Sequence, residues 1–393
     1  MKLKRNIPLI YVISGLMWGR FFIPVLALFY IASQVSLDKF AIIMSVFSLS
    51  ILLLEIPTGA LADLLGRKKT LLLARLMYVI EIILIAFFNG FWIFLIAKVI
   101  SGVGVSLSSG TSQAITYDTL KKQKRENQYK KISGNIGVVT NISMAIVFII
   151  GAYLFSISPK LPAIVSLPFI VLGFLLTFFL EEPYRSKMKA SFKNHWKQIK
   201  EGFVYFKKLN FVKYLAIMSL FTSVAISITL SMSSVYFERI LIPISLIGAL
   251  AFIASLLTAF TAKKADKWEN KLGEGKSIFI IQILIILGLF LISFMIPYFG
   301  YLCYLIIPFV AGFNGVVVGN YMNKHVKSSH RATTLSIANM FGNLGIFILF
   351  PFIGHLDKIK GFSFSFIIFG LIILVGFILL YIYKLKLKLK FNS

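Results

Sequence analysis

The sequence predicts an all-α integral membrane protein with twelve transmembrane helices, arranged as two pseudo-symmetric bundles of six. Three observations predict this fold class. The 393 residues have a mean hydropathy of +0.88 and only 14% charged residues, outside the range of soluble domains. Apolar runs of about 20 residues, long enough to cross a bilayer, recur along the chain. A charged loop in the first half is echoed in the second half.

Each span is expected where an apolar run lies between polar or basic segments. In the first half these runs predict helices at 7–33, 40–62, 70–88, 91–118, 132–156 and 162–181. In the second half they predict helices at 212–237, 244–262, 277–297, 300–323, 332–355 and 362–384. The first run is too long for a signal peptide and no small-residue cleavage site follows it, so we expect it to be the first span.

The expected domains are an N-terminal bundle (1–181), a cytoplasmic linker (182–211) and a C-terminal bundle (212–393). Within the linker, aromatic and aliphatic residues recur at steps of three and four with lysines between them: Phe192, Trp196, Ile199, Phe203 and Phe206. This pattern predicts a basic amphipathic helix on the inner leaflet. A simple connection between the halves is the alternative for its role.

The net charge of +27 follows the predicted topology. An even number of spans puts both termini on one side. If that side is the cytoplasm, cytoplasmic segments hold 33 of the 41 Lys and Arg residues and outer loops hold 5. This bias obeys the positive-inside rule, so we expect membrane lipids, and not nucleic acid, as partners of the basic charge. The expected location is the bacterial inner membrane, with cytoplasmic termini.

The residue types limit which cofactors and reactions the chain could support. Cys303 is the only cysteine, which excludes an internal disulfide and a thiolate metal cluster. The four histidines show no ligand spacing, so neither a metal nor another cofactor is expected: His195, His325, His330 and His355. A phosphate-binding loop and a catalytic cluster at membrane depth are both missing from the sequence, so ATP is not the expected energy source and the chain is not expected to be an enzyme.

The segment 59–69, GALADLLGRKK, predicts a tight charged loop between the second and third helices. Gly59 would permit close helix approach, and Gly66 can adopt the positive φ of a sharp turn. Asp63 could cap the incoming helix or pair with Arg67. The segment 262–276 repeats the pattern with a longer insert, and its matching positions are Ala262, Asp266, Gly273 and Lys276. The 203 residues between the two aspartates indicate a duplicated transporter fold.

The segment 59–69 resembles motif A of the major facilitator superfamily, with Leu64 where the family has a basic residue. The segment 98–104, KVISGVG, resembles motif B, with Lys98 in place of the usual arginine. The resemblance implies a small-molecule transporter with a cytoplasmic gate formed by Asp63, Arg67 and Asp118. The segments EIPTG (55–59) and SGT…YD (109–118) are similar to the corresponding segments of bacterial permeases labelled as drug or multidrug efflux proteins. The Gly-Pro pair of motif C is missing from 132–156, which weakens the case for proton antiport.

Four charges are predicted deep in the membrane, at Arg20, Glu55, Glu81 and Lys98. Each costs about 2.5–3.5 kcal/mol there, which indicates function. Glu81 is the expected proton carrier, and Lys98, at similar depth on the next antiparallel helix, is its expected partner. A static ion pair that fixes helix packing is the alternative. Glu55 either takes part in proton coupling or belongs to the gate.

The substrate cavity is expected near Arg20, which would bind an anionic group of the substrate or an internal carboxylate. Trp18 and Phe21 flank it as candidate cavity aromatics, with packing or lipid contact as the alternative. In the second half, Asn314 and Asn339 are expected as polar points on an apolar wall.

The predicted function is secondary active transport by alternating access, as proton-coupled efflux of a small amphipathic molecule by a monomeric antiporter. The alternative is a proton symporter or uniporter that imports a nutrient or metabolite. A non-transporting sensor or scaffold is a third class, favoured if the intramembrane charges prove dispensable for flux.

Overall fold

The computed structural model describes residues 2–183, 204, 206, 209–326 and 331–387, and every regular element in these ranges is helical. Nine helices among the described residues are long and apolar enough to cross a membrane, and two shorter apolar helices accompany them, Ile23–Ala32 and Leu161–Thr177. Helices suit a lipid environment because each satisfies its backbone N–H and C=O groups internally. The predicted amphipathic helix of the linker lies almost wholly outside the described residues.

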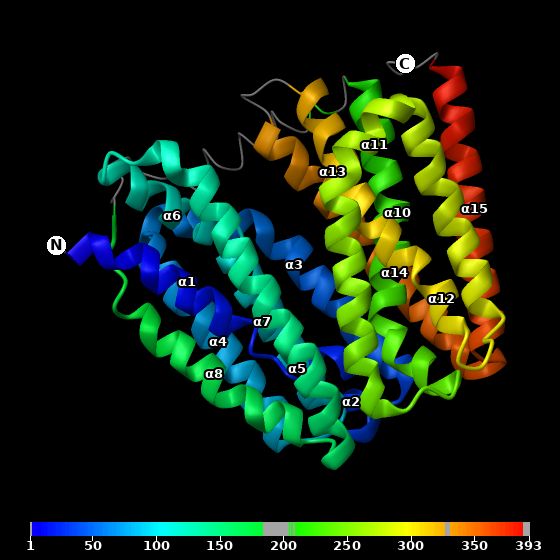
Figure 1. The fold of residues 1–393 in the computed structure, drawn as a ribbon, viewed down its shortest axis with the longest axis horizontal. Helices are drawn as coiled ribbons and strands as arrows, with labels where there is room; N and C mark the ends of the chain where they lie inside the picture. The colour runs from blue at the N-terminus through cyan, green and yellow to red at the C-terminus, as the bar shows by residue number, and fades with distance from the viewer. Residues whose placement is uncertain (1, 184–203, 205, 207–208, 327–330, 388–393) are drawn as a thin grey trace. The chain divides into compact units, whose positions relative to one another are not determined.

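The chain forms two compact units. Unit 1 comprises Met1–Val35, Val46–Trp196 and Ile244–Gly248, and unit 2 comprises Ser36–Ser45, Lys197–Pro243 and Ala249–Ser393. The helices of unit 1 are α1 (Asn6–Met17), α2 (Leu26–Ala32), most of α3 (Leu37–Leu65), α4 (Arg67–Phe87), α5 (Phe91–Ser108), α6 (Thr111–Lys122), α7 (Tyr129–Ile157) and α8 (Leu161–Thr177), with short 3-10 turns at Lys2–Arg5, Ile23–Val25 and Glu126–Gln128. Within it α4 packs against α5 and α8, and α1 packs against α7 and α8 (Figure 1).

Unit 2 is built around α10. Its helices are α10 (Asn210–Arg239), α11 (Ile244–Ser293) after the first turn, α12 (Gly300–Tyr304), α13 (Ile306–His325), α14 (Arg331–Lys360) and α15 (Phe362–Lys386). Helix α10 contacts α13, α14 and α15. At one end of α10 the buried Tyr236 donates a hydrogen bond to the Gly300 carbonyl and stacks with Tyr304 and Phe362.

Several helices begin or end differently from the sequence prediction. The run 91–118 is divided between α5 and α6, because Ser109 adopts an extended backbone with ψ of 130°. The predicted helices 244–262 and 277–297 correspond to the two parts of α11, which are separated by non-helical backbone at Gly273, and both parts extend into the segment expected to be a loop between them. Hydropathy therefore located the apolar runs, while local backbone geometry set the helix ends.

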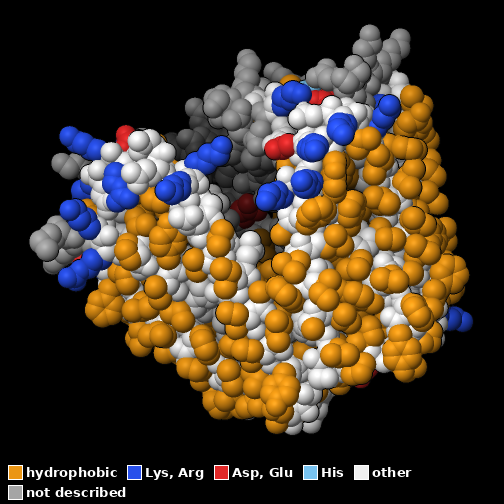
Figure 2. Space-filling model, in the orientation of Figure 1, with side chains coloured by type: hydrophobic (Ala, Val, Ile, Leu, Met, Phe, Trp, Pro, Cys, Tyr) orange, Lys and Arg blue, Asp and Glu red, His pale blue; other side chains and the backbone are white. Residues whose placement is uncertain are grey.

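The outer surface of each unit is apolar, as a lipid-facing protein requires. Helix α7, for example, exposes Val138, Ile142, Ile146 and Ile149 along one stripe. Figure 2 shows hydrophobic side chains over the flanks of the helices and Lys and Arg side chains gathered at one end of each unit. The basic end is the one that the charge count assigns to the cytoplasm.

Candidate functional site

The first predicted span is broken in the middle, which corrects the expectation of one helix over 7–33. Helix α1 ends at Met17, a short 3-10 turn runs from Ile23 to Val25, and α2 begins at Leu26. Pro24 cannot donate a helical hydrogen bond, and the Phe21 N–H turns aside to donate to Ser166 Oγ at 2.9 Å. Gly151 of α7 lies so close to the Phe21 carbonyl that a Cβ there would collide with it. The break places Arg20 on a non-helical turn inside unit 1.

Arg20, Glu81 and Lys98 form one cluster, which we call the buried ion-pair cluster. Lys98 Nζ of α5 donates to Glu81 Oε1 of α4 at 2.8 Å, and Arg20 Nη1 lies 3.4 Å from Glu81 Oε2. The Glu81 side chain is 3% exposed, Lys98 7% and Arg20 17%. The two carboxylate oxygens therefore have separate cationic partners, so protonation of Glu81 would weaken both pairs together.

Helix spacing explains why the cluster forms. Helices α4 and α5 are joined by only three residues, 88–90, so they run antiparallel and bring Glu81 and Lys98 to the same depth. Arg20 reaches them because the first span breaks at its position. The free-energy cost of burying each charge is offset only while its oppositely charged partner stays in place.

The other residues expected near this cluster are placed differently. Glu55 lies on α3 and forms no part of the two ion pairs to Glu81. Trp18 follows the end of α1 with 37% of its surface exposed, whereas Phe21 is buried and packs edge-on against Phe169. Their role as cavity aromatics stays a prediction, as does the part of Glu55 in coupling.

In unit 2 the two predicted polar points differ from each other. Asn314 lies on α13, and its side-chain oxygen is buried without a hydrogen-bond partner among the described residues. Asn339 lies on α14 and is exposed. A buried, unpartnered amide oxygen is uncommon in folded proteins, which favours Asn314 over Asn339 as a contact for a bound molecule.

The loop of motif A is held by an acid that the sequence analysis missed. Both carboxylate oxygens of Glu182 accept from the first backbone amides of α4, those of Arg67 at 3.0 Å and Lys68 at 2.8 Å. Gly66 has φ of +90°, which L-residues rarely adopt, and permits the sharp turn into α4. Arg67 Nε lies 3.6 Å from Asp118 Oδ2, so the structure brings these two predicted gate residues together. Gly59 and Asp63 are in α3, and their side chains lie outside the described residues.

The second loop contains the same positive-φ glycine turn. Gly273 has φ of +76° inside α11, and it matches Gly66 as the sequence echo predicts. Asp266 accepts from Asn320 Nδ2 at 3.2 Å, and Glu274 pairs with Lys324 at 3.1 Å. Lys276 is exposed. The copies therefore share the glycine turn, while the side-chain contacts around them differ.

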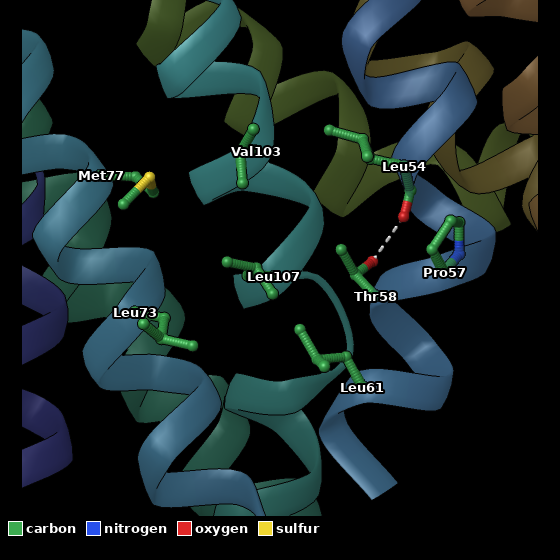
Figure 3. A pocket seen from close by; sticks show the side chains of 8 residues that line it. All are labelled: Leu54, Pro57, Thr58, Leu61, Leu73, Met77, Val103 and Leu107. Atoms are coloured by element: carbon green, nitrogen blue, oxygen red, sulfur yellow. Dashed lines mark hydrogen bonds between the residues drawn. The ribbon is translucent and has the colours of Figure 1, made fainter. Parts of the chain in front are cut away.

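An open, largely apolar pocket of about 350 Å³ lies in unit 1, close to the motif A loop. Its lining comes from α3, α4 and α5 (Figure 3), and consists of Leu54, Pro57, Thr58, Leu61, Leu73, Met77, Val103 and Leu107. Pro57 removes one backbone donor from α3, and the Thr58 hydroxyl bonds across to the Ser106 carbonyl at 3.1 Å. The Thr58 hydrogen bond ties α3 to α5 beside the pocket.

Other functional candidates had little signal in the sequence. Arg239 donates from its two terminal guanidinium nitrogens to the two carboxylate oxygens of Asp357, at 2.5 and 3.1 Å, across 118 positions of the chain. Glu182 is the second acid of a Glu-Glu pair at a predicted helix end, a position that sequence alone assigns to solvent. No group of three or more potential metal ligands occurs among the residues that the structure describes.

The helical membrane fold, the buried ion-pair cluster and the duplicated glycine turn define a membrane transporter. The family model for the Major Facilitator Superfamily matches residues 9–348, so the chain belongs to this family, and the resemblance carried by motif A is confirmed. Transport, and not enzyme catalysis, is the activity of this class.

Relatives and solved structures agree with this placement. The chain is 25% identical over 304 residues to the class H tetracycline resistance protein of Pasteurella multocida, covering 75% of this chain and 74% of that protein. It is 28% identical to an uncharacterized transporter of Buchnera aphidicola, covering 77% of each. A match to the class B tetracycline resistance protein of Escherichia coli, at 23% identity, spans 40% of this chain but only 38% of that protein.

The nucleoside transporter NupG has the same fold, with a TM-score of 0.80 at 15% identity over 99% of this chain and all of that one. The D-xylose–proton symporter gives a TM-score of 0.70, also at 15% identity, over 95% of this chain and 96% of that one. At these identities the likeness extends to the fold alone.

Proposed function

We propose that this protein is a secondary active transporter that exports a small amphipathic molecule in exchange for protons, by alternating access. The observation that carries the proposal is Glu81, a carboxylate buried in the transmembrane core and shared by Arg20 and Lys98. A titratable acid at this depth is costly unless it is paired, and intramembrane acids of this kind serve proton relays. The likeness to tetracycline resistance proteins supports the direction of transport.

The same cluster supplies a coupling step. When Glu81 is ionised, both cations are held against α4, and the turn that follows α1 is tied to α4 and α5. When a proton binds Glu81, the attraction to Arg20 and Lys98 falls, and either cation becomes free to contact cargo or a rearranged helix. Exchange of a proton for cargo at one cluster yields antiport.

We further propose the complete topology of twelve spans in two six-helix bundles, in the inner membrane of a bacterium with both termini in the cytoplasm. The distribution of Lys and Arg supports it, because 33 of the 41 fall in segments assigned to the cytoplasm. The largely apolar pocket beside α3 supports an amphipathic cargo.

Proton-driven import of a nutrient or metabolite is the second candidate. It is favoured by the missing Gly-Pro pair in α7, where drug–proton antiporters of the family often carry motif C. The same Glu81 would then release its proton on the inner side together with the cargo.

Glu81→Gln tests the coupling role. Inverted vesicles with an imposed pH gradient are given a panel of small amphipathic compounds that includes tetracycline, and compound uptake and proton efflux are measured together. We expect Glu81→Gln to abolish proton-coupled flux, because the amide cannot exchange a proton. Glu126→Gln, which removes an exposed acid of a loop, is the matched control. Normal pH-driven flux in the folded Glu81→Gln protein would overturn the assignment.

A further inference from the structure

The Tyr78 ring of α4 has two arginines beside it. The guanidinium carbon of Arg20 lies 4.3 Å from the ring centre, and that of Arg75 lies 5.8 Å from it. The Tyr78 hydroxyl is 3.0 Å from Ser108 Oγ, which itself donates to the Val105 carbonyl, so Tyr78 is the donor in this pair. The ring is buried and held at its hydroxyl, which makes it a fixed platform for both cations.

Positive charge exceeds negative charge around this platform. Glu81 is already shared by Arg20 and Lys98, and Arg75 adds a third cation. Arg75 Nε is buried without a hydrogen-bond partner among the described residues. Even with Glu55 counted, the described side chains of unit 1 at membrane depth carry one positive charge in excess. Arg75 lies eight residues, or about 12 Å, from the start of α4, deep enough for an unbalanced charge to be costly.

We propose that Arg20 and Arg75, which meet at the Tyr78 ring, bind the carboxylate of an organic monoanion, so that the cargo is an amphipathic monocarboxylate. This deepens the proposed function and rests on it. A guanidinium donates two parallel hydrogen bonds to a carboxylate, and the excess of one charge matches a monoanion. The apolar body of the ligand follows from the amphipathic cargo of the proposed function. An inorganic anion would satisfy the charge but lacks this apolar body.

The geometry also connects cargo with the proton site. Arg20 contacts Glu81 at 3.4 Å, the longer of the two ion pairs, while Lys98 holds the other oxygen at 2.8 Å. A carboxylate at Tyr78 competes with Glu81 for Arg20 and leaves Glu81 to Lys98 alone. Cargo binding and the protonation of Glu81 then alter the same ion pair, which is the linkage that exchange requires.

Benzoate and benzamide are a matched pair of probes, equal in shape and different in charge. The purified protein in phosphatidylcholine nanodiscs is titrated with benzoate, benzamide and inorganic phosphate, and the thermal midpoint and binding isotherm are recorded. We expect benzoate to bind and raise the midpoint, and benzamide and phosphate to do neither. Arg75→Gln should weaken benzoate binding at least about tenfold, as expected for the loss of one charge-assisted bidentate contact.

Arg125→Gln, which removes an exposed arginine from a loop, should bind benzoate like the parent. Equal binding of benzoate and benzamide, or full benzoate binding by a folded Arg75→Gln protein, would overturn the proposal. Nanodiscs made with phosphatidylglycerol test whether an anionic lipid headgroup occupies the site instead. If benzoate no longer binds in these nanodiscs, the site belongs to lipid and the cargo assignment is overturned. If benzoate binding depends on Arg75 but pH-driven flux is absent, the site stands and the transport proposal fails. If other compounds are exported without benzoate binding, the reverse holds.

Discussion

Glu81 depends most on Lys98 among its two cationic partners. The Lys98 ammonium makes the shorter contact, and both side chains are nearly inaccessible. Removing one partner of a buried ion pair leaves an uncompensated charge, so Lys98→Met should lower the free energy of unfolding by about 3 kcal/mol. Chemical unfolding in detergent measures this change.

A double-mutant cycle with Glu81→Gln provides the control for that prediction. The double variant has no Glu81 carboxylate that could be left buried without its lysine partner, so it should be more stable than Lys98→Met alone. Strictly additive effects of the two substitutions would contradict a direct interaction between Glu81 and Lys98.

Lys160 gives stability a pH dependence. It lies just before α8, and its ammonium donates to the carbonyls of Ile85 and Phe88 at 2.8 and 2.6 Å. Burial lowers the pKa of Lys160 from 10.5 to about 8. The neutral amine retains two N–H donors for the two carbonyls, so deprotonation preserves this contact.

The folded state therefore loses the Lys160 proton before the unfolded chain does, and stability should rise as pH increases from about 8 to 10.5. The side chain is only about half buried, so the gain is about 1 kcal/mol after solvent screening. Thermal midpoints measured across this range test it, with Lys160→Met expected to flatten the profile. A Lys160→Met profile that rises as steeply as the parent would count against the assignment.

The sequence located part of the site and missed the rest for physical reasons. Glu81 and Lys98 could be paired from sequence because a three-residue connection forces α4 and α5 to run antiparallel. Arg20 was expected to bind either the substrate or an internal carboxylate, and the choice stayed open because hydropathy does not reveal that α1 stops at Met17. Arg75 was not among the charges predicted deep in the membrane, and its place beside Tyr78 is identified only by packing.

At the scale of elements, Glu182 holds the start of α4. Its carboxylate accepts from the amides of Arg67 and Lys68, two of the donors that a helix N-terminus leaves unsatisfied. Its charge also faces the positive end of the helix dipole. Glu182→Gln should cost about 1 kcal/mol of stability and speed hydrogen exchange at the first amides of α4.

Glu181→Gln is the matched control for this cap. Glu181 is adjacent in sequence, but it is the backbone of Glu181, and not its carboxylate, that binds Asn6. Hydrogen exchange at Arg67 and Lys68 should therefore be unchanged in this variant. Equal exchange rates in both variants would show that Glu182 is not the cap.

The two loops show which features of an element a sequence echo predicts. Gly66 and Gly273 correspond in sequence, and both have positive φ, because only this backbone geometry turns one helix sharply into the next. Glu182, which accepts from the amides that follow Gly66, lies in the segment after α8, whereas Glu274 beside Gly273 pairs with Lys324. Side-chain partners come from distant segments, so the echo predicted the turn but not the contacts.

At the scale of the whole molecule, the membrane orientation follows from charge placement. Segments rich in Lys and Arg are retained on the cytoplasmic side during membrane insertion, so we expect the basic segments to lie inside. Among the helices that the structure describes, α7 connects the basic loop before it to the loop that contains Lys160. We therefore expect residues at its two ends to lie on opposite sides of the membrane.

The lone Cys303 makes this orientation directly testable. In a Cys303→Ser background, single cysteines replace exposed residues at Glu126 and Lys271, on the predicted inner side, and at Pro159 and Lys360, on the predicted outer side. A membrane-impermeant maleimide applied to intact cells should label the two outer positions, and the two inner ones only after permeabilisation. The positions in each half are separated by an odd number of predicted spans, so labelling of both members of a pair from the same side would contradict the twelve-span topology.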